Sequence, residues 1–330
     1  MPRGGAVKTP LPMAITMGDA SGVGPEILLR RFAAGQLGDG VLVYGDAAIL
    51  EAGASLLDLR VPLHGIDRPA AAKPSRLNVV DLAGLAARDL TPGAFNAKAG
   101  KAARNYVEAA TRAALAGEVA GVVTLPINKE ATRVSTPGFV GHTEFIAELC
   151  GARDFAMMLT TPEVAVSHVS AHVPIRDAIS LVTPERIFTV TRLTHETLAG
   201  LGNPPRIAIC GLNPHAGENG LIGVEDREII APAIEAARRA GFDASGPHPA
   251  DTVFHQAIRQ DRFDAIVCMY HDQGHAPMKL LSFETAVNIT IGLPIVRTSV
   301  DHGTAFDIAW RGEAFTGSLE AALDWAWKLT

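Results

Sequence analysis

Short apolar runs alternate with longer stretches of helical character along most of the chain. The stretch 183–202 begins with a threonine followed by proline and ends with glycine, as helices commonly do. Helices that alternate with buried strands predict an α/β fold with a mostly parallel sheet. The predicted strands are 40–46, 76–82, 120–126, 163–173, 205–213, 264–271 and 286–294, and the clearest predicted helices are 99–118, 183–202 and 226–241. The proline-rich segment 61–76 is predicted to be a surface connection.

Length and charge limit the class of protein. A chain of 330 residues exceeds the usual size of a single core, so two domains or lobes are expected. The formal net charge of −6 provides no basic field for nucleic acid or an anionic membrane. Three scattered cysteines, no signal-peptide pattern in the first dozen residues and no run of about 18 apolar residues predict a cytoplasmic protein without a membrane span.

The segment "GDASGVGPEI", residues 18–27, lies between an apolar run and a predicted helix. A dinucleotide fingerprint requires G-x-G-x-x-G, whereas Gly18, Gly22 and Gly24 form G-x-x-x-G-x-G. The G-K-[ST] of a P-loop is also missing from the segment. We therefore favour a tight strand-to-helix turn, with Pro25 near the first helical position, over direct phosphate binding.

Polar clusters follow four of the predicted strands: "LPINKE", "HVPIRD", "NPHAGENG" and "HDQGH". Strand ends in such folds face a ligand crevice, so we expect one shared crevice. His172, His215 and His271 lie in these clusters. Three neutral imidazoles with an open position describe a catalytic metal site, although a single histidine at a strand end is more often a hydrogen-bonded structural residue.

Spacing alone leaves the ligand set open. His168 and His172 are four residues apart, as are His271 and His275, and positions at this spacing share a face, so either pair could chelate a metal. The glycine within "HDQGH" is expected to turn the chain and separate its two histidines. The third ligand cannot be chosen from the spacing.

Cations beside the strand ends are candidates for binding phosphate or carboxylate. Lys129, Lys279 and Arg297 have this position, while the alternative for each is a solvated surface charge. Arg297 is the best candidate because its neighbours in "GLPIVRTSVDHG" are apolar and an unpaired charge among them would be costly.

Six motifs in order, "GHTEF", "GLNPHAGENG", "PADT", "MYHDQG", "VNITIGLP" and "RTSVDHGTA", resemble the 4-hydroxythreonine-4-phosphate dehydrogenase family of pyridoxal phosphate biosynthesis. The resemblance extends from about residue 13 to the end of the chain. It implies the two-lobed α/β/α fold of isocitrate and isopropylmalate dehydrogenases, without a Rossmann domain. Residues 1–135 plus 305–330 would form one lobe and 136–304 the other, with the active-site cleft between them. It also implies a homodimer whose active site is assembled from both subunits.

The same resemblance implies the role of individual residues. One divalent metal ion, zinc foremost and magnesium, cobalt or nickel otherwise, would be bound by His172, His215 and His271, which leaves His168 and His275 outside the ligand set. The cofactor would be NAD, with "DHGTAFDIAWRG" (301–312) similar to the adenosine-side loop of those dehydrogenases. The implied cofactor residues are His302, Gly303 and Asp307, the substrate residues His142, Thr143, Lys279, Asn288 and Arg297, and the catalytic residues Lys279 and Asp272.

The implied reaction is oxidation of the 3-hydroxyl of a four-carbon 4-phosphorylated hydroxy acid, followed by decarboxylation. "GDASGVGP" and "LPINKE" stand where the biosynthetic branch typically has "GEPAGIGP" and "GPVHK". These departures favour a second branch that oxidises D-threonate and D-erythronate 4-phosphate, with 4-hydroxy-L-threonine 4-phosphate as the other candidate. Two alternatives are a dehydrogenase of a cyclic diol dicarboxylate and a non-catalytic protein that binds small acids.

Overall fold

The computed structural model describes residues 10–282 and 285–330, which divide into two compact units. Unit 1 contains the described residues up to Cys150, together with His302–Leu319 and Thr330. Unit 2 contains Gly151–Asp301 and Glu320–Leu329. None of the helices in the described ranges has the length and apolar character needed to cross a membrane.

The boundaries of these units differ from those of the predicted lobes. Helix α5 (His142–Leu149) packs against α3 (Ala97–Leu115), and the first unit therefore continues past residue 135 to Cys150. Most of α11 (Gly317–Lys328) belongs to unit 2, where Thr298 Oγ1 donates a hydrogen bond of 2.8 Å to the Ala322 carbonyl. The segment 305–330 is thus divided between the two units, and the predicted lobes stay a prediction.

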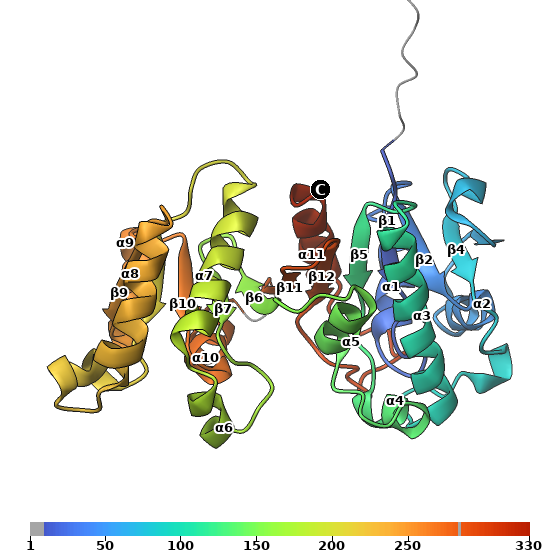
Figure 1. Cartoon of the computed structure of the whole chain (residues 1–330). Helices are drawn as coiled ribbons and strands as arrows, with labels where there is room; N and C mark the ends of the chain where they lie inside the picture. Colours follow the sequence, from blue (N-terminus) through green and yellow to red (C-terminus); the bar gives the residue numbers. More distant parts are fainter. Residues whose placement is uncertain (1–9, 283–284) are drawn as a thin grey trace, which may run out of the picture. The chain divides into compact units, whose positions relative to one another are not determined.

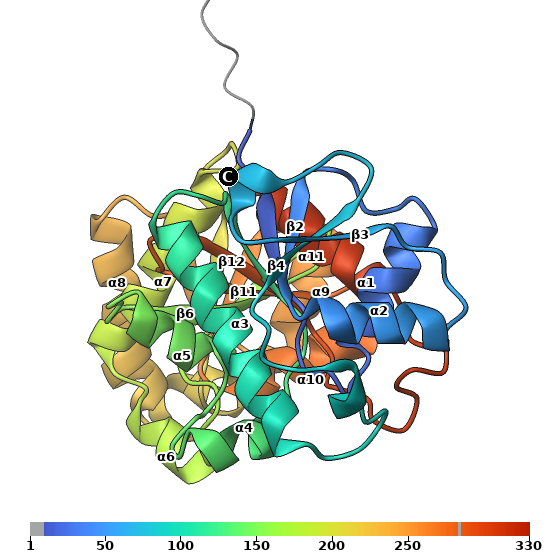
Figure 2. The ribbon, with the colours of Figure 1, turned by 90° about the vertical axis from the view of Figure 1, so that its right-hand side faces the viewer.

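Unit 1 contains five strands in the order β3-β4-β2-β1-β5, and each of the four pairings is parallel (Figure 1). This order differs from the 3-2-1-4-5-6 order of a dinucleotide-binding domain. Helix α3 runs along β1 and β2 (Figure 2). The strands are β1 Met13–Thr16, β2 Val41–Gly45, β3 Leu63–Ile66, β4 Leu77–Asp81 and β5 Gly121–Thr124, and the other helices are α1 Gly24–Ala33, α2 Ala47–Leu56 and α4 Lys129–Ser135.

Unit 2 contains seven strands in the order β12-β11-β6-β7-β10-β8-β9. Strand β11 is antiparallel to both neighbours and β6 is antiparallel to β7, whereas β7, β10, β8 and β9 are parallel. Helices α8 and α9 lie beside β9 and β10, respectively (Figure 1). The strands are β6 Ala156–Thr160, β7 Ala165–His168, β8 Ile207–Cys210, β9 Ala244–His248, β10 Ala265–Cys268, β11 Val287–Ile291 and β12 Val296–Val300, and the helices are α6 Ile175–Ser180, α7 Pro184–Ala199, α8 Ala231–Arg239, α9 Ala250–Gln260 and α10 His271–Ser282.

The predicted elements are confirmed in type but less often in extent. Helix α7 begins as predicted, because Thr183 Oγ1 accepts a hydrogen bond of 3.2 Å from the Arg186 amide. The predicted helix 226–241 begins with a π-helical turn at Asp226–Ile230 before α8. The prediction that 61–76 is only a connection is wrong, because β3 lies within it and pairs with β4.

The glycine-rich segment after β1 is the tight turn that the sequence predicts. Gly18 has φ of +75°, and a Cβ atom there would lie 2.5 Å from the Pro126 carbonyl oxygen. A Cβ on Gly24 would lie 2.6 Å from the Met17 carbonyl oxygen. Pro25 occupies the first turn of α1. Close approach of the backbone within unit 1 therefore accounts for these two glycines.

Candidate functional site

The three predicted metal ligands follow neighbouring parallel strands of unit 2. His172 follows β7, His271 is the first residue of α10 after β10, and His215 follows β8. Strand β10 pairs in parallel with both β7 and β8, so all three segments leave the same edge of the sheet. Three of the four polar clusters therefore lie at one edge of unit 2, whereas "LPINKE" follows β5 of unit 1, and the crevice shared by all four stays a prediction.

Hydrogen bonds beyond the strands hold the three segments together. The Ser170 hydroxyl, after β7, donates a hydrogen bond of 2.9 Å to the Met269 carbonyl, after β10. The buried Gln273 side chain accepts from the Met269 amide and donates to the Gly211 carbonyl, both at 2.7 Å, which ties the start of α10 to the end of β8. Gln273 was not singled out from the sequence, because glutamine within "HDQGH" has no recognisable pattern of its own.

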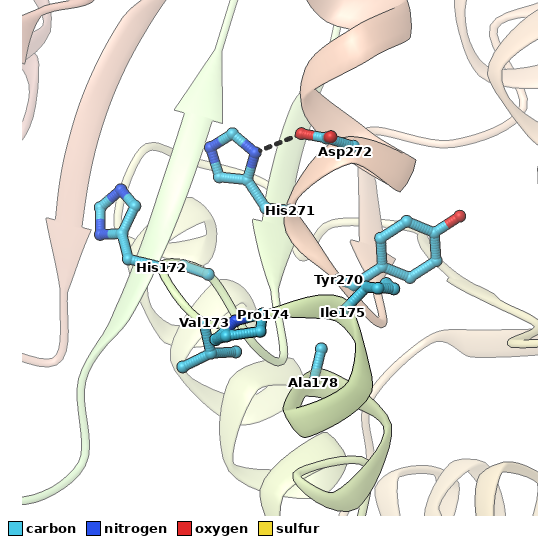
Figure 3. Close-up of a pocket in the computed structure, with 9 residues that line it drawn as sticks. His172, Val173, Pro174, Ile175, Ala178, Tyr270, His271 and Asp272 are labelled. Atoms are coloured by element: carbon cyan, nitrogen blue, oxygen red, sulfur yellow. Dashed lines mark hydrogen bonds and ion pairs between the residues drawn. The ribbon is translucent and has the colours of Figure 1, made fainter.

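His172 and His271 line the same cavity of about 340 Å³, and their ring centroids are 5.8 Å apart (Figure 3). His271 Nδ1 lies 2.7 Å from Asp272 Oδ1. Because an ionised carboxylate can only accept, this contact places the proton of a neutral His271 on Nδ1 and leaves the Nε2 lone pair for a ligand. Asp272, predicted to be catalytic, thus orients a neighbouring histidine.

Two further histidines lie behind His271. The His275 ring stacks on the His271 ring, with centroids 3.8 Å apart and an interplanar angle of 12°. His275 Nδ1 lies 3.1 Å from His168 Nε2, and His168 Nδ1 lies 3.3 Å from the Met157 carbonyl oxygen. Burial lowers the pKa of His168 to about 4 and that of His275 to about 2. Because these two contacts engage both nitrogens of His168, neither nitrogen is left for a ligand.

The expectation that Gly274 turns the chain and separates His271 from His275 is wrong. Gly274 lies inside α10, where positions four apart share a face and the two rings can stack. A Cβ on Gly274 would lie 2.6 Å from both His168 Nε2 and Val166 Cγ1. The glycine therefore allows α10 to approach β7 closely, which is a packing role that the sequence does not distinguish from a turn.

His215 lies in an unusual turn at Pro214–Gly220, in which His215–Asn219 all have left-handed backbone angles. The buried Asp226 carboxylate anchors the start of this turn by accepting from the Leu212 amide at 2.7 Å and from the Asn213 amide at 3.2 Å. Asp226 was not predicted, because an acidic residue at the start of a helical stretch is typical of an ordinary helix N-terminus.

A carboxylate of the same turn contacts His215. His215 Nδ1 lies 2.6 Å from Glu218 Oε1, and this hydrogen bond raises the pKa of His215. In residues 10–282 and 285–330, no three His, Cys, Asp or Glu side chains are grouped closely enough to hold a metal ion. The structure thus brings together His172 and His271, and the place of His215 in the ligand set stays a prediction.

Three predicted substrate residues belong to unit 2. Arg297, on β12, is 3% exposed and donates a hydrogen bond of 2.9 Å to Thr290 Oγ1 on β11. Asn288 is two residues from Thr290 on the same strand and therefore lies on the same face. Its Oδ1 atom is buried and accepts no hydrogen bond from the described residues. Lys279 Nζ donates a hydrogen bond of 2.6 Å to the Asp301 carbonyl and also pairs with the Asp301 carboxylate.

The remaining predicted residues belong to unit 1. His142 and Thr143 begin α5, and a Cβ on the preceding Gly141 would lie 3.5 Å from Lys129 Nζ. His302 Nδ1 lies 3.0 Å from the Gly303 carbonyl oxygen and its Nε2 lies 3.0 Å from Ser318 Oγ. Gly303 and Asp307 are exposed. Donors, a cation and an exposed carboxylate are therefore present where the resemblance expects contacts with substrate and cofactor.

Residues 39–326 match the protein family described as Pyridoxal phosphate biosynthetic protein PdxA. The chain belongs to the PdxA family. It is 43% identical over 325 residues to the D-threonate 4-phosphate dehydrogenase of Pectobacterium atrosepticum, a match that covers 96% of this chain and 98% of the relative. It is 44% identical over 321 residues to the 4-hydroxythreonine-4-phosphate dehydrogenase of Beijerinckia indica, with 96% and 95% covered.

The fold of this PdxA family member is also that of solved relatives. A crystal structure of 4-hydroxythreonine-4-phosphate dehydrogenase from Klebsiella pneumoniae matches with a TM-score of 0.87 and 43% identity, covering 97% of this chain and 99% of the other. The predicted family and the α/β fold class are confirmed, and the chain is an oxidoreductase of the dehydrogenase class. The predicted alternative of a non-catalytic binding protein is set aside by this membership.

Proposed function

We propose that the chain is an NAD-dependent dehydrogenase that oxidises the 3-hydroxyl of a four-carbon 4-phosphorylated hydroxy acid, after which the product loses carbon dioxide. The similarity of at least 43% to relatives named for two such substrates carries the proposal. We favour D-threonate or D-erythronate 4-phosphate over 4-hydroxy-L-threonine 4-phosphate, because "GDASGVGP" and "LPINKE" depart from the usual pattern of the biosynthetic branch.

Two histidines of unit 2 offer imidazole donors of the kind that a divalent cation of the zinc type prefers. His172 and His271 face one cavity, and the carboxylate of Asp272 holds His271 in the tautomer that a ligand needs. Imidazoles favour zinc, cobalt or nickel over magnesium, and we propose His215 as the third ligand. When bound, such a cation supplies a Lewis acid that lowers the pKa of the substrate hydroxyl.

The cations of unit 2 are suited to hold the charged ends of the substrate. Arg297 is buried beside apolar strands, where a guanidinium is strongly favoured by an anionic partner. Asn288 offers an amide on the same face of the β11–β12 pair. We assign to Lys279 the exchange of a proton with the hydroxyl oxygen on C3 of the substrate, while hydride leaves C3 for the nicotinamide. The resulting 3-oxo acid releases carbon dioxide and takes up one proton at C2.

The NAD site is proposed at the loop 302–314 of unit 1. Gly303 is exposed, and a Cβ there would meet no atom within 4 Å, so a ligand can approach its backbone closely. The exposed Asp307 carboxylate can accept hydrogen bonds from ribose hydroxyls. His302 is held in one orientation by Ser318 and the Gly303 carbonyl. His142 and Thr143, at the start of α5, are proposed to bind the substrate.

We also propose a cytoplasmic homodimer in which each active site draws on both subunits. The three cysteines are free, and Cys210 and Cys268 are unbonded although their sulfur atoms are 3.8 Å apart, in keeping with a reducing compartment. Small-angle scattering of the purified chain should give the mass of a dimer. A fully active monomer would contradict the shared site.

A second candidate is the oxidation of a cyclic diol dicarboxylate. A structure of terephthalate 1,2-cis-dihydrodiol dehydrogenase from Burkholderia xenovorans matches with a TM-score of 0.67 and 30% identity, covering 96% of this chain and 98% of the other. Both values are below those for the Klebsiella pneumoniae structure, so this candidate ranks second.

The deciding experiment follows the reduction of NAD with each candidate substrate and added Zn²⁺. We expect the largest kcat/KM with D-erythronate or D-threonate 4-phosphate. A value at least about tenfold higher for 4-hydroxy-L-threonine 4-phosphate, equivalent to about 1.4 kcal/mol in the transition state, would reverse the choice of branch. Turnover of the terephthalate dihydrodiol alone would favour the second candidate, and no reduction of NAD with any of the four would overturn the proposed reaction.

A further inference from the structure

We propose that the glycine-rich segment 18–26 is a positioning element for the loop 302–314, and that it thereby sets the affinity for the adenosine half of the cofactor. The segment and the loop are far apart in the sequence but belong to the same compact unit. The inference rests on the proposed NAD site at His302, Gly303 and Asp307, and it gives the segment a role that the reaction itself does not require.

Two backbone groups of the segment hold the middle of the loop. The indole Nε1 of Trp310 donates a hydrogen bond of 2.9 Å to the Ala20 carbonyl. The Val23 amide donates a hydrogen bond of 3.0 Å to the Thr304 carbonyl. Trp310 is 5% exposed, so its hydrogen bond is shielded from water. These contacts fix the loop on both sides of Asp307.

A third contact fixes the end of the loop. The Glu26 carboxylate, which is fully buried on α1, accepts a hydrogen bond of 3.1 Å from the Ala314 amide. Arg30 lies one turn further along α1. Its Nη1 donates a hydrogen bond of 2.6 Å to the Ala314 carbonyl and lies 3.2 Å from the Glu26 carboxylate. Both polar groups of the Ala314 backbone are therefore bound to the helix that the glycine-rich segment begins.

Two residues of the loop have strained backbone angles, which the hydrogen bonds described above help to hold. Ala305 and Trp310 have φ of +41° and +65°, a left-handed conformation that is unfavourable for residues with a Cβ. Strained residues of this kind persist where surrounding contacts determine the conformation, and they concentrate at ligand-binding sites. The hydrogen bond that the Ala20 carbonyl accepts from Trp310 and the one that the Val23 amide donates to Thr304 lie at or next to these two strained positions.

Gly22 packs closely against Thr304 of the loop. A Cβ on Gly22 would lie 3.0 Å from both the Cβ and the carbonyl oxygen of Thr304. The Gly22 amide donates to the Asp19 carbonyl, and the Ser21 amide donates to Asp19 Oδ1. The amides of Ser21, Gly22 and Val23 are thus all engaged within the unit, which argues against direct phosphate binding by this segment.

The test compares Gly22→Ala with Gly38→Ala, a matched control in which the added Cβ meets no atom within 4 Å. Calorimetry measures binding of NAD and ADP-ribose to each full-length protein, and inhibition assays compare ADP-ribose with nicotinamide mononucleotide. We expect Gly22→Ala to weaken NAD and ADP-ribose binding by about fivefold or more, equivalent to about 1 kcal/mol. Its kcat at saturating NAD, its KM for the phosphorylated acid and its inhibition by nicotinamide mononucleotide should match those of Gly38→Ala.

Trp310→Phe provides an independent variant, because it removes the hydrogen bond to Ala20 but keeps an aromatic ring in the loop. It should weaken ADP-ribose binding in the same selective way, and it carries the test if Gly22→Ala fails to fold. If folded Gly22→Ala and Trp310→Phe bind ADP-ribose as tightly as Gly38→Ala, the positioning role is overturned while the proposed function stands. If the unaltered chain binds neither NAD nor ADP-ribose, the proposed cofactor site fails and the positioning role fails with it.

Discussion

The segment 18–26 of unit 1 and the turn 213–220 of unit 2 both follow a buried parallel strand, yet they differ in what their polar groups contact. In the first, the amides of Ser21, Gly22 and Val23 all have acceptors within the unit. In the second, the backbone is anchored through Asp226, while the His215 side chain remains 60% exposed. A strand end whose donors are used internally supports its neighbours, and a strand end that presents side chains outward is available for chemistry.

The two regions also differ in how their unusual backbone relates to glycine. The glycines of 18–26 are explained by backbone atoms closer than 3.1 Å to the position of a Cβ. In the turn 213–220, by contrast, His215, Ala216, Glu218 and Asn219 adopt left-handed angles without being glycine. A glycine-rich pattern therefore does not by itself indicate a ligand site in this chain, because close packing within the unit accounts for these glycines.

The largest expected effect belongs to the cavity of unit 2 that His172 and His271 line. His271→Ala should lower kcat/KM by about 10³-fold, equivalent to about 4 kcal/mol, because it removes a proposed ligand of the divalent cation. His255→Ala, which removes an exposed histidine of α9, should leave the rate within about twofold. Steady-state rates of NAD reduction compare the two. Equal rates for both variants would show that the His172–His271 cavity is not the reaction site.

The second prediction concerns the buried carboxyl group of Asp19 in the segment 18–26. Desolvation raises the pKa of Asp19 from 3.8 to about 6. A raised pKa in the folded state means that this group favours folding most below about pH 4, and that the contribution is lost as pH rises through 6. Asp19→Asn keeps an acceptor for the Ser21 amide and should therefore be more stable than the unaltered chain above pH 6, by up to about 3 kcal/mol.

Urea unfolding of Asp19→Asn at pH 4.5 and pH 7.5 measures this difference, with Asp324→Asn on the exposed face of α11 as the control. The stability advantage of Asp19→Asn over Asp324→Asn should be clearly larger at pH 7.5 than at pH 4.5. If Asp19→Asn instead abolishes turnover without changing stability, the carboxyl group takes part in chemistry and the contrast between the two regions fails.

Asp226→Asn should weaken the anchor of the turn 213–220. The substituted amide can accept from only one side, so either the Leu212 or the Asn213 amide loses its partner in a buried site. We expect the free energy of unfolding to fall by about 2 kcal/mol, together with a lower affinity for Zn²⁺ because His215 is no longer held. Asp324→Asn should change neither quantity. Unchanged stability in Asp226→Asn would mean that other contacts maintain the turn.

The smallest expected effect isolates close packing from backbone conformation. Gly18 and Gly35 have similar φ, +75° and +68°, but only a Cβ on Gly18 meets other atoms. Alanine at both positions carries the cost of a left-handed residue, and Gly18→Ala adds a clash with the Pro126 carbonyl. We expect Gly18→Ala to be less stable than Gly35→Ala by about 1–2 kcal/mol in urea unfolding. Equal stabilities would show that the segment 18–26 shifts to accommodate the added Cβ at little energetic cost.

Much of the fold could be predicted because buried parallel strands are short and apolar, but three strands of unit 2 were missed. Strand β9 contains Gly246 and Pro247 and pairs on one side with β8, and such a strand lacks a strong pattern. Strand β12 carries buried polar residues, Thr298 and Ser299, and β6 is a run of only five residues. Antiparallel insertion of β11 beside β6 depends on tertiary pairing that local sequence does not specify.

The site was predicted in its residue types more than in its geometry. Histidines at strand ends identified His172 and His271, because position along a strand is visible in the sequence. The stacking of His275 on His271 was not predicted, since it depends on Gly274 being helical where α10 packs against β7. Asp226 lies outside the turn that contains His215, and only the folded structure shows that its carboxylate anchors the start of that turn.

The most direct test of the contrast is the stoichiometry and affinity of Zn²⁺ binding to metal-free protein, measured by calorimetry and elemental analysis. One Zn²⁺ per chain should bind to the unaltered protein and, with the same affinity, to Gly22→Ala of the segment 18–26. His172→Ala should lose at least about 100-fold in affinity because it removes a proposed ligand. Stoichiometric, undiminished binding to His172→Ala would contradict the account, as would loss of Zn²⁺ binding in folded Gly22→Ala.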